Sequence, residues 1–112
     1  MEQVPNLRYY FNAFSGALTS EILRVPGPGE SIKIWGYIIS TDTASTVTLE
    51  LRDTSAKDGD SRFAARFYFA ANDGANLAPG NAPIARGDRV ATLALSSTGA
   101  GALSVAIIYQ ED

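Results

Sequence analysis

The 112-residue sequence predicts an all-β protein built as a single domain. Short runs of β-branched and aromatic residues recur with a period of two, which is the pattern of half-buried strands. Clusters of Gly, Pro, Asn and Asp separate these runs, and we find no convincing helix among them. Many short strands with turn signals between them indicate a sandwich or a barrel.

The N-terminal segment Leu7–Phe14 is rich in aromatic residues, too rich for a free tail. We expect it to form a first strand or an arm docked on another surface. A weaker strand candidate, Leu18–Val25, follows. The expected division of the chain is therefore 1–17 for the arm or first strand and 18–112 for the β-sandwich domain.

The clearest strand is Ser31–Ser40, which is entered through the breaker cluster Pro26–Gly29. Simple alternation predicts two faces for this strand. Gly36 lies in the middle of the strand and predicts a bulge or a close backbone approach. The predicted faces are Ile32, Ile34 and Ile38 on one side, and Lys33, Trp35, Tyr37 and Ile39 on the other.

Thr46–Arg52 alternates more regularly, with Val47, Leu49 and Leu51 predicted to face inward. The connection Thr41–Ser45 is short and polar. We therefore expect this strand to pair with the preceding one as a hairpin.

Arg62–Ala70 is predicted to be a strand, with a helix as the alternative because of its alanines. The period of two in Phe63, Ala65, Phe67 and Phe69 favours the strand. Ala71–Gly87 reads as a long irregular stretch. A loop of that length in a small domain is usually functional or packed against a partner.

Asp88–Ser96 and Leu103–Gln110 are the last two predicted strands, and the Gly-rich segment Ser97–Gly101 predicts a hairpin between them. Leu103–Gln110 is apolar on both faces, which is typical of a central strand or of one covered by a partner. The count is six to seven strands. We expect a small antiparallel β-sandwich, jelly-roll-like in topology.

Composition excludes several kinds of chemistry. The chain has no Cys and no His, which excludes disulfides, thiolate or imidazole metal ligands, and the usual catalytic triads. Its net charge of −3 argues against a nucleic-acid partner. Glu2 stands where a signal peptide would be basic, and no apolar run is long enough to span a membrane, so we expect a chain that begins at or near Met1 and has no membrane partner.

Two short motifs each allow a binding interpretation and a purely structural one. Arg86-Gly87-Asp88 could bind an integrin from an exposed loop, but Gly87-Asp88 is favoured as the tight turn before a strand. The carboxylates of Asp53, Asp58 and Asp60 around Gly59 resemble the start of a calcium loop. The ligand order of an EF-hand is absent, so a solvated loop is favoured.

Aromatic residues suggest a possible sugar site. Trp35 and Tyr37 on one strand face, with Tyr68 nearby, could form a flat platform for sugar rings. A second core layer or a subunit contact is the favoured interpretation, because aromatic residues are enriched in both.

Three arginines, Arg52, Arg62 and Arg66, could form a basic ridge beside Tyr68. Glu50 and Asp53 lie close in sequence and would pair with these arginines across strands, which disfavours nucleic-acid binding. We expect no catalytic residues, no cofactor and no metal site.

The segment SIKIWGYIISTDTASTVTLELRD, from Ser31 to Asp53, resembles the opening hairpin of small virion proteins of tailed phages. The C-terminal stretch IARGDRVATLALSSTGAGALSVAIIYQED is similar in style to the end of the same group, with a Gly-Asp turn, a Gly/Ala hairpin and a final apolar strand. The group includes capsid decoration proteins, also called cement proteins.

The resemblance implies a non-enzymatic structural protein, made in the host cytoplasm and carried on the capsid surface. It implies a homotrimer that binds between major capsid proteins and stabilises the phage head. The alternative is a carbohydrate- or receptor-binding module of a phage tail. The residues expected at the subunit or capsid interface are Tyr9, Tyr10, Phe11, Phe14, Trp35, Tyr37, Arg66 and Tyr68.

Overall fold

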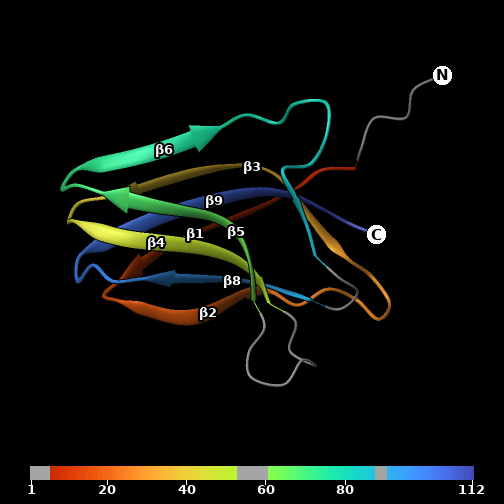
Figure 1. Cartoon of the computed structure of the whole chain (residues 1–112), viewed down its shortest axis with the longest axis horizontal. Coiled ribbons are helices and arrows are strands. Elements are labelled where there is room, and N and C mark those ends of the chain that lie inside the picture. The colour runs from red at the N-terminus through yellow and green to blue at the C-terminus, as the bar shows by residue number, and fades with distance from the viewer. Residues whose placement is uncertain (1–5, 53–60, 88–90) are drawn as a thin grey trace.

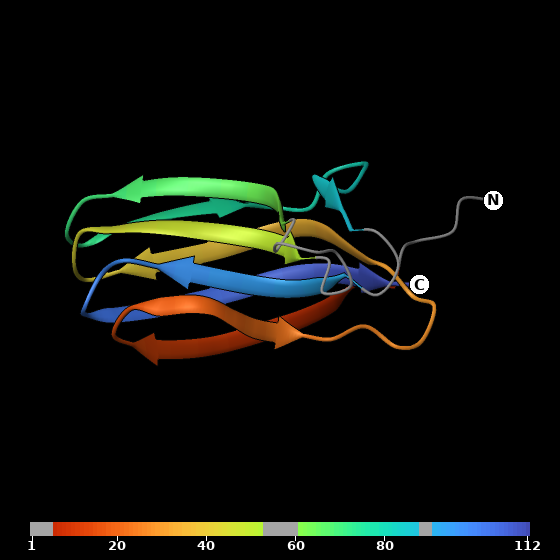
Figure 2. The ribbon, with the colours of Figure 1, turned by 60° about the horizontal axis from the view of Figure 1, so that its bottom comes forward.

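The computed structural model describes residues 6–52, 61–87 and 91–112, with residues 61–64 described by backbone only. These residues form two antiparallel β-sheets packed face to face, with no helix in the described ranges, which confirms the predicted all-β sandwich. In Figure 1 the strands of both sheets run along the long axis of the molecule. Figure 2 shows one sheet lying in front of the other.

We call the two sheets sheet A and sheet B. Sheet A has the order β1-β9-β3-β6, with β7 also paired to β3, and sheet B has the order β2-β8-β4-β5. Sheet A consists of β1 (Arg8–Ser15), β9 (Ala102–Glu111), β3 (Ile32–Thr41), β6 (Asp73–Leu77) and β7 (Ala85–Arg86). Sheet B consists of β2 (Leu18–Arg24), β8 (Thr92–Ser97), β4 (Ser45–Arg52) and β5 (Ser61–Phe69).

The strand pairing is nested. β1 pairs with β9, β2 with β8, β3 with β6 and β4 with β5, so the first four strands meet later strands in reverse order. The described ranges contain nine strands where six to seven were predicted. The difference arises partly because Ala71–Gly87, expected to be irregular, contains β6 and β7.

Both predicted hairpins are wrong. β3 and β4 lie in different sheets, as do β8 and β9, so each short connection crosses from one sheet to the other. The two crossing turns bind each other: Gly101 N–H donates to Thr43 Oγ1 at 3.2 Å, and Ala102 N–H donates to Asp42 Oδ1 at 2.7 Å. A short polar turn suits a hairpin or a corner equally well, and these contacts between distant segments decide for the corner.

The core lies between the sheets and is aliphatic. Val47, Leu49 and Leu51 are buried as predicted. Each fully buried side chain of this size contributes roughly 1.5–3 kcal/mol relative to its exposed state. Core residues that are almost fully buried are Ile32, Ile34, Ile39, Val47, Leu49, Leu51, Leu93, Leu95, Val105 and Ile107.

Gly36 marks a β-bulge, as predicted. The β3–β9 register shifts between Ile34 and Gly36, which reverses the alternation of the strand. Ile34 before the shift and Ile39 after it are both buried, whereas Ile38 is 57% exposed. The predicted face that joined Ile38 to Ile34 is therefore wrong, because the bulge turns the second half of β3 over.

A second register shift occurs where β4 pairs with β5. Ala65 pairs with Leu49, but Phe63 pairs with Glu50, so the four residues of the predicted Phe/Ala face do not follow one uninterrupted period. The strand itself, predicted over Arg62–Ala70, is confirmed as β5.

Candidate functional site

The outer face of sheet A is apolar across three neighbouring strands. The register places Phe11 beside Ala106 and Ile38, and it places Tyr9 beside Ile108 in the next row. We call these five residues the apolar face. Tyr9 is 75% exposed, Phe11 73% and Ile38 57%. Contiguous apolar side chains this exposed mark a binding surface more often than a free one.

Polar side chains border the apolar face at both ends of the strands. On one side Ser104 lies beside Ser40. On the other side Lys33 lies beside Gln110, whose Oε1 accepts a hydrogen bond from Trp35 Nε1 at 3.1 Å. A centre without charge and a polar rim are the layout of a protein–protein contact.

A shallow hollow of about 230 Å³ lies where the apolar face meets β6. It forms because the chain leaving β6 passes close to Gly36: a Cβ at that position would lie 2.5 Å from the Leu77 carbonyl oxygen. The hollow offers a place for an apolar side chain of a partner. Its lining residues are Ile38, Asn76, Leu77, Ala78, Pro79 and Ile108.

The outer face of sheet B is polar, and its side chains bond to one another and to the backbone. Ser96 Oγ donates to Glu50 Oε1 at 3.1 Å and accepts the backbone N–H of Ser20 at 2.9 Å. Arg66 Nε donates to Thr48 Oγ1 at 3.3 Å. Glu50 is only 6% exposed in this setting. The exposed large apolar side chains of sheet B, Ile22 and Tyr68, lie on its two opposite edge strands, β2 and β5, and are not neighbours.

Trp35, Tyr37 and Tyr68 do not form the sugar platform, which was the disfavoured interpretation of these residues. Trp35 is 7% exposed, so most of its ring is covered. Tyr37 packs against the core and meets Phe67 edge-on, with ring centroids 5.1 Å apart. Tyr68 is 76% exposed but belongs to sheet B. The bulge at Gly36 is the physical reason, because it separates the surroundings of Trp35 and Tyr37.

The predicted interface residues of β1 divide between its two faces. Tyr9 and Phe11 belong to the apolar face, whereas Tyr10 and Phe14 pack partly buried against the core. The sequence reasoning did not select Ile38, Ala106 or Ile108. One signal could have found them: Leu103–Gln110 is apolar on both faces, and a bulge at Gly36 brings Ile38 to the same outer side.

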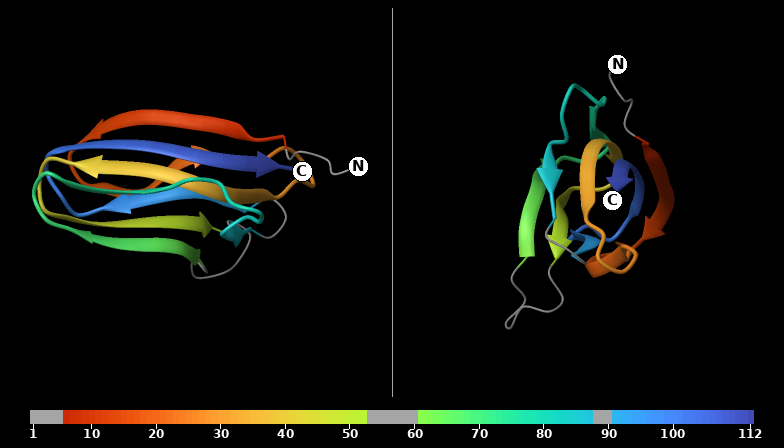
Figure 3. Two further views of the ribbon diagram at one scale, coloured as in Figure 1. Left: turned by 90° about the horizontal axis from the view of Figure 1, so that it is seen from above. Right: turned by 90° about the vertical axis from the view of Figure 1, so that its right-hand side faces the viewer.

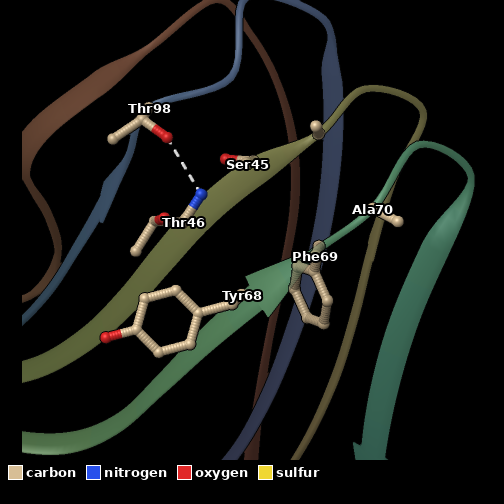
Figure 4. A pocket seen from close by; sticks show the side chains of 7 residues that line it. Ser45, Thr46, Tyr68, Phe69, Ala70 and Thr98 are labelled. Atoms are coloured by element: carbon tan, nitrogen blue, oxygen red, sulfur yellow. Dashed lines mark hydrogen bonds between the residues drawn. The ribbon is translucent and has the colours of Figure 1, made fainter.

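Tyr68 stands beside an open hollow of about 320 Å³ at one end of the β4–β5 hairpin (Figure 4). The hydroxyl of Thr98 accepts the Thr46 backbone N–H at 2.9 Å, and the hydroxyl of Ser45 accepts the Gly99 N–H at 2.9 Å. Each hydroxyl keeps a proton that it can donate. This end of sheet B therefore presents one exposed aromatic ring and a few hydroxyl groups that can donate hydrogen bonds.

An ion-pair cluster around Glu111, at the C-terminal end of β9, joins the two sheets. The carboxylate of Glu111 in sheet A accepts two hydrogen bonds from Arg24 in sheet B, at 2.8 and 3.1 Å, and a third from Gly27 N–H at 3.3 Å. Arg8 lies 3.9 Å from the same carboxylate. The hydrogen bond from Arg24 lowers the pKa of Glu111 to about 2, and the Gly27 N–H acts in the same direction.

The short sequence motifs have different outcomes. Arg86 lies in β7 opposite Lys33, and Gly87 N–H donates to Ile32 O at 2.9 Å, so this part of the tripeptide is strand-paired and not a free loop. Asp88 lies outside the described residues. The proposed calcium-loop residues Asp53, Asp58, Gly59 and Asp60 also lie outside them.

The predicted basic ridge is interrupted. Arg66 lies opposite Thr48, and the alternation of β4 places Glu50 between Thr48 and Arg52. The side chain of Arg62 lies outside the described residues. An acidic group between two arginines weakens the attraction that a phosphate backbone would feel.

In the described part of the chain no three acidic side chains converge as a metal site. The same residues contain no helix of the length and apolarity needed to cross a membrane. No protein-family model matches the sequence, and neither a curated protein nor a solved structure matches it.

Proposed function

We propose that this chain is a non-enzymatic structural protein of a virion, of the capsid decoration or cement type. It binds between major capsid proteins and stabilises the phage head from the capsid surface. The resemblance of Ser31–Asp53 and residues 84–112 to small virion proteins gives the class. The same resemblance implies a homotrimer, and that stoichiometry remains a prediction.

The observation that carries the proposal is the apolar face. Its five residues lie on three hydrogen-bonded strands, so the surface is rigid and needs little ordering when a partner binds. Tyr9 and Phe11 supply exposed aromatic side chains, the kind that most often act as binding anchors. A surface of this kind suits binding to another folded protein better than turnover of a small molecule.

We also propose that the sandwich is a jelly roll. The nested pairing, in which the first four strands meet later strands in reverse order, supports this assignment. A comparison of strand order with an experimental structure of the chain would test it. A different order in either sheet would refute it.

Binding to capsids tests the functional proposal. The purified chain should co-sediment with capsids of the phage that encodes it, prepared without the decoration protein. Ile38→Asp places a charge in the apolar face and should weaken binding at least tenfold, or about 1.4 kcal/mol. Tyr68→Asp changes a side chain that is exposed on sheet B and should bind like the wild type. Equal loss in both variants, or no capsid binding by the wild type, would count against the proposal.

The second candidate is a carbohydrate- or receptor-binding module of a phage tail. The hollow beside Tyr68 favours it, because an exposed ring next to free hydroxyl protons can stack on and bind a sugar. A glycan array probes this function directly. Binding that Tyr68→Ala abolishes and Ile38→Asp leaves intact would support the module over the capsid protein.

A further inference from the structure

β1 forms an open edge of sheet A. Both views in Figure 3 place this red strand at the margin of the sheet. It runs for eight residues in unbroken register with β9, and Arg8 is its only charged residue. Natural sheets usually protect such edges with bulges, charges or short strands, since an unprotected edge pairs readily with another strand.

The other described edge strands carry such protection. β2 has two register shifts and a positive φ of 45° at Ser20, and β6 has only five residues. β5 has a register shift and the charged Arg62 and Arg66. Among the edges that the structure describes, β1 is therefore the one prepared for strand addition.

The backbone groups that point outward from β1 can be identified. Gly16 N–H donates to Gly101 O at 3.1 Å, and this pair continues the β1–β9 register by one position. Hydrogen-bonded and non-bonded pairs alternate along an antiparallel ladder, so the even-numbered residues of β1 bond to β9. The N–H and C=O groups of Tyr9, Phe11, Ala13 and Ser15 consequently point to the open edge. Within one copy the Ala13 N–H donates to Asn12 Oδ1 at 2.8 Å, a local bond that strand pairing would replace.

We propose that β1 pairs with β1 of a second copy of this chain, antiparallel and about a two-fold axis at Phe11, in place of the homotrimer that the resemblance implies. In this register Phe11 lies opposite Phe11 of the partner subunit, and Tyr9 lies opposite Ala13 of the partner subunit. Each such pair exchanges both of its N–H···O bonds. Tyr9, Phe11 and Ala13 then find backbone partners within the strand, and Ser15 lies opposite Leu7 of the partner subunit.

The side chains fit this register. Across the outer face a large residue, Tyr9, meets a small one, Ala13, and the two Phe11 rings form an aromatic cross-strand pair. Tyr10 meets Asn12 of the partner subunit on the inner side, the same two side chains that bond within one copy at 3.2 Å. The charge of Arg8 favours the antiparallel direction, because parallel strands would place the two Arg8 side chains together.

The pairing also enlarges the apolar face, and this consequence rests on the proposed function. A two-fold axis perpendicular to the sheet keeps the outer faces of both copies on one side, with both Phe11 side chains at the centre. Large aromatic side chains cover roughly 150–250 Å² each, so one copy offers on the order of half of the ~800 Å² per partner found in stable interfaces. Two copies approach that area.

The mass of the protein in solution tests the pairing. Light scattering behind size exclusion should give two subunits for the wild type at micromolar concentration. Ala13→Pro removes an outward N–H that β9 does not use and that bonds within one copy only to the exposed Asn12 side chain. Proline is tolerated at such edge positions, so the variant should give one subunit with an unchanged circular dichroism spectrum. A wild-type mass of one subunit would overturn the pairing. A mass of three would overturn it in favour of the homotrimer.

A cysteine test does not depend on the proline variant folding. The chain has no native Cys, so a single introduced one reports contact between copies. Opposite residues of a hydrogen-bonded antiparallel pair have Cα atoms about 5.5 Å apart, within the span of a disulfide. Phe11→Cys should therefore form a disulfide-linked dimer under mild oxidation, whereas Tyr68→Cys, equally exposed but on sheet B, should not. Equal cross-linking in both would refute the register.

The two proposals fail separately. A wild type of two subunits that does not bind capsids would retain the pairing and refute the capsid function. A single subunit that binds capsids through Ile38 would retain the function and refute the pairing.

Discussion

The outer faces of the two sheets differ, although both sheets alternate inward and outward residues in the same way. The inward faces are both aliphatic, with Ile34 and Val105 in sheet A meeting Leu49 and Leu95 in sheet B within one core. Outward, sheet B carries a bonded polar surface that includes Glu50, whereas sheet A carries the apolar face.

This difference distinguishes the residues that stabilise the fold from those that are available for binding. A sandwich is stabilised by its inward faces, and apolar residues that stay exposed on an outward face contribute little to folding. Tyr9, Phe11 and Ile38 are therefore not needed to hold the two sheets together. Our proposals assign these exposed side chains to a contact outside the subunit.

The largest loss of stability should come from a substitution at Gly36, the bulge residue that separates the two halves of β3. Gly36→Ala forces a methyl group against the Leu77 carbonyl oxygen, a backbone atom that cannot move without disturbing the β3–β6 pairing. We expect a loss of about 2–3 kcal/mol in the free energy of unfolding. Urea titration followed by the fluorescence of Trp35, the single tryptophan, measures it. Gly80→Ala, where a Cβ meets nothing within 4 Å, is the control and should change stability little.

Breaking the ion-pair cluster between the sheets should cause the second-largest loss of stability. Because the folded-state pKa of Glu111, about 2, lies below the unfolded value of 4.5, its contribution is fully present above pH 4.5 and is lost as the pH falls toward 2. Glu111→Gln should cost about 1–2 kcal/mol at pH 7, a figure reduced because Arg24 is partly exposed. The difference between wild type and variant should shrink as the pH falls from 5 to 2. A difference that is constant over this range would contradict the assigned role.

Removing a hydroxyl from each outer face compares the two surfaces directly. Ser96→Ala in sheet B deletes the hydrogen bonds to Glu50 and from Ser20, and should cost about 1 kcal/mol. Ser104→Ala in the rim of the apolar face is the matched change, with an expected cost below about 0.5 kcal/mol. Thermal and urea unfolding of both variants gives the comparison. Equal costs would mean that the polar network of sheet B adds no more stability than an isolated hydroxyl at the rim of the apolar face.

The smallest effect should come from Tyr68. Because its ring is 76% exposed, Tyr68→Ala should change stability by less than about 0.5 kcal/mol. Tyr37→Ala removes a partly buried ring that packs against Phe67 and the core, and should cost about 2 kcal/mol. Similar losses in both variants would indicate that Tyr68 is covered, and would remove the hollow beside it from consideration.

Local patterns predicted the strands better than the pairing between them. The inward residues of β4 followed from strict alternation, and the bulge followed from a glycine inside a strand. The turns at Thr41–Ser45 and Ser97–Gly101 looked like hairpins because they are short and polar. Nothing local distinguishes a turn that reverses a strand within one sheet from a turn that carries it to the other.

The candidate site was predicted only in part for the same reason. Tyr9 and Phe11 were selected because aromatic residues crowd the N-terminal segment. Ile38 was placed on one face with Ile32 and Ile34 because the alternation was read through Gly36 without a change of phase. Trp35 and Tyr37 were expected at a surface, but the packing of β3 covers the first and turns the second toward Phe67.

The sequence by itself determined the all-β class, the position of most strands, and the absence of histidine and cysteine chemistry. These properties depend on residue type and short-range periodicity, which the chain displays directly. Only the tertiary structure decided which strands pair, which outer face stays apolar, and which edge stays open. Those properties depend on contacts between residues far apart in the chain, such as β1 with β9 and Arg24 with Glu111, and no local pattern encodes such contacts.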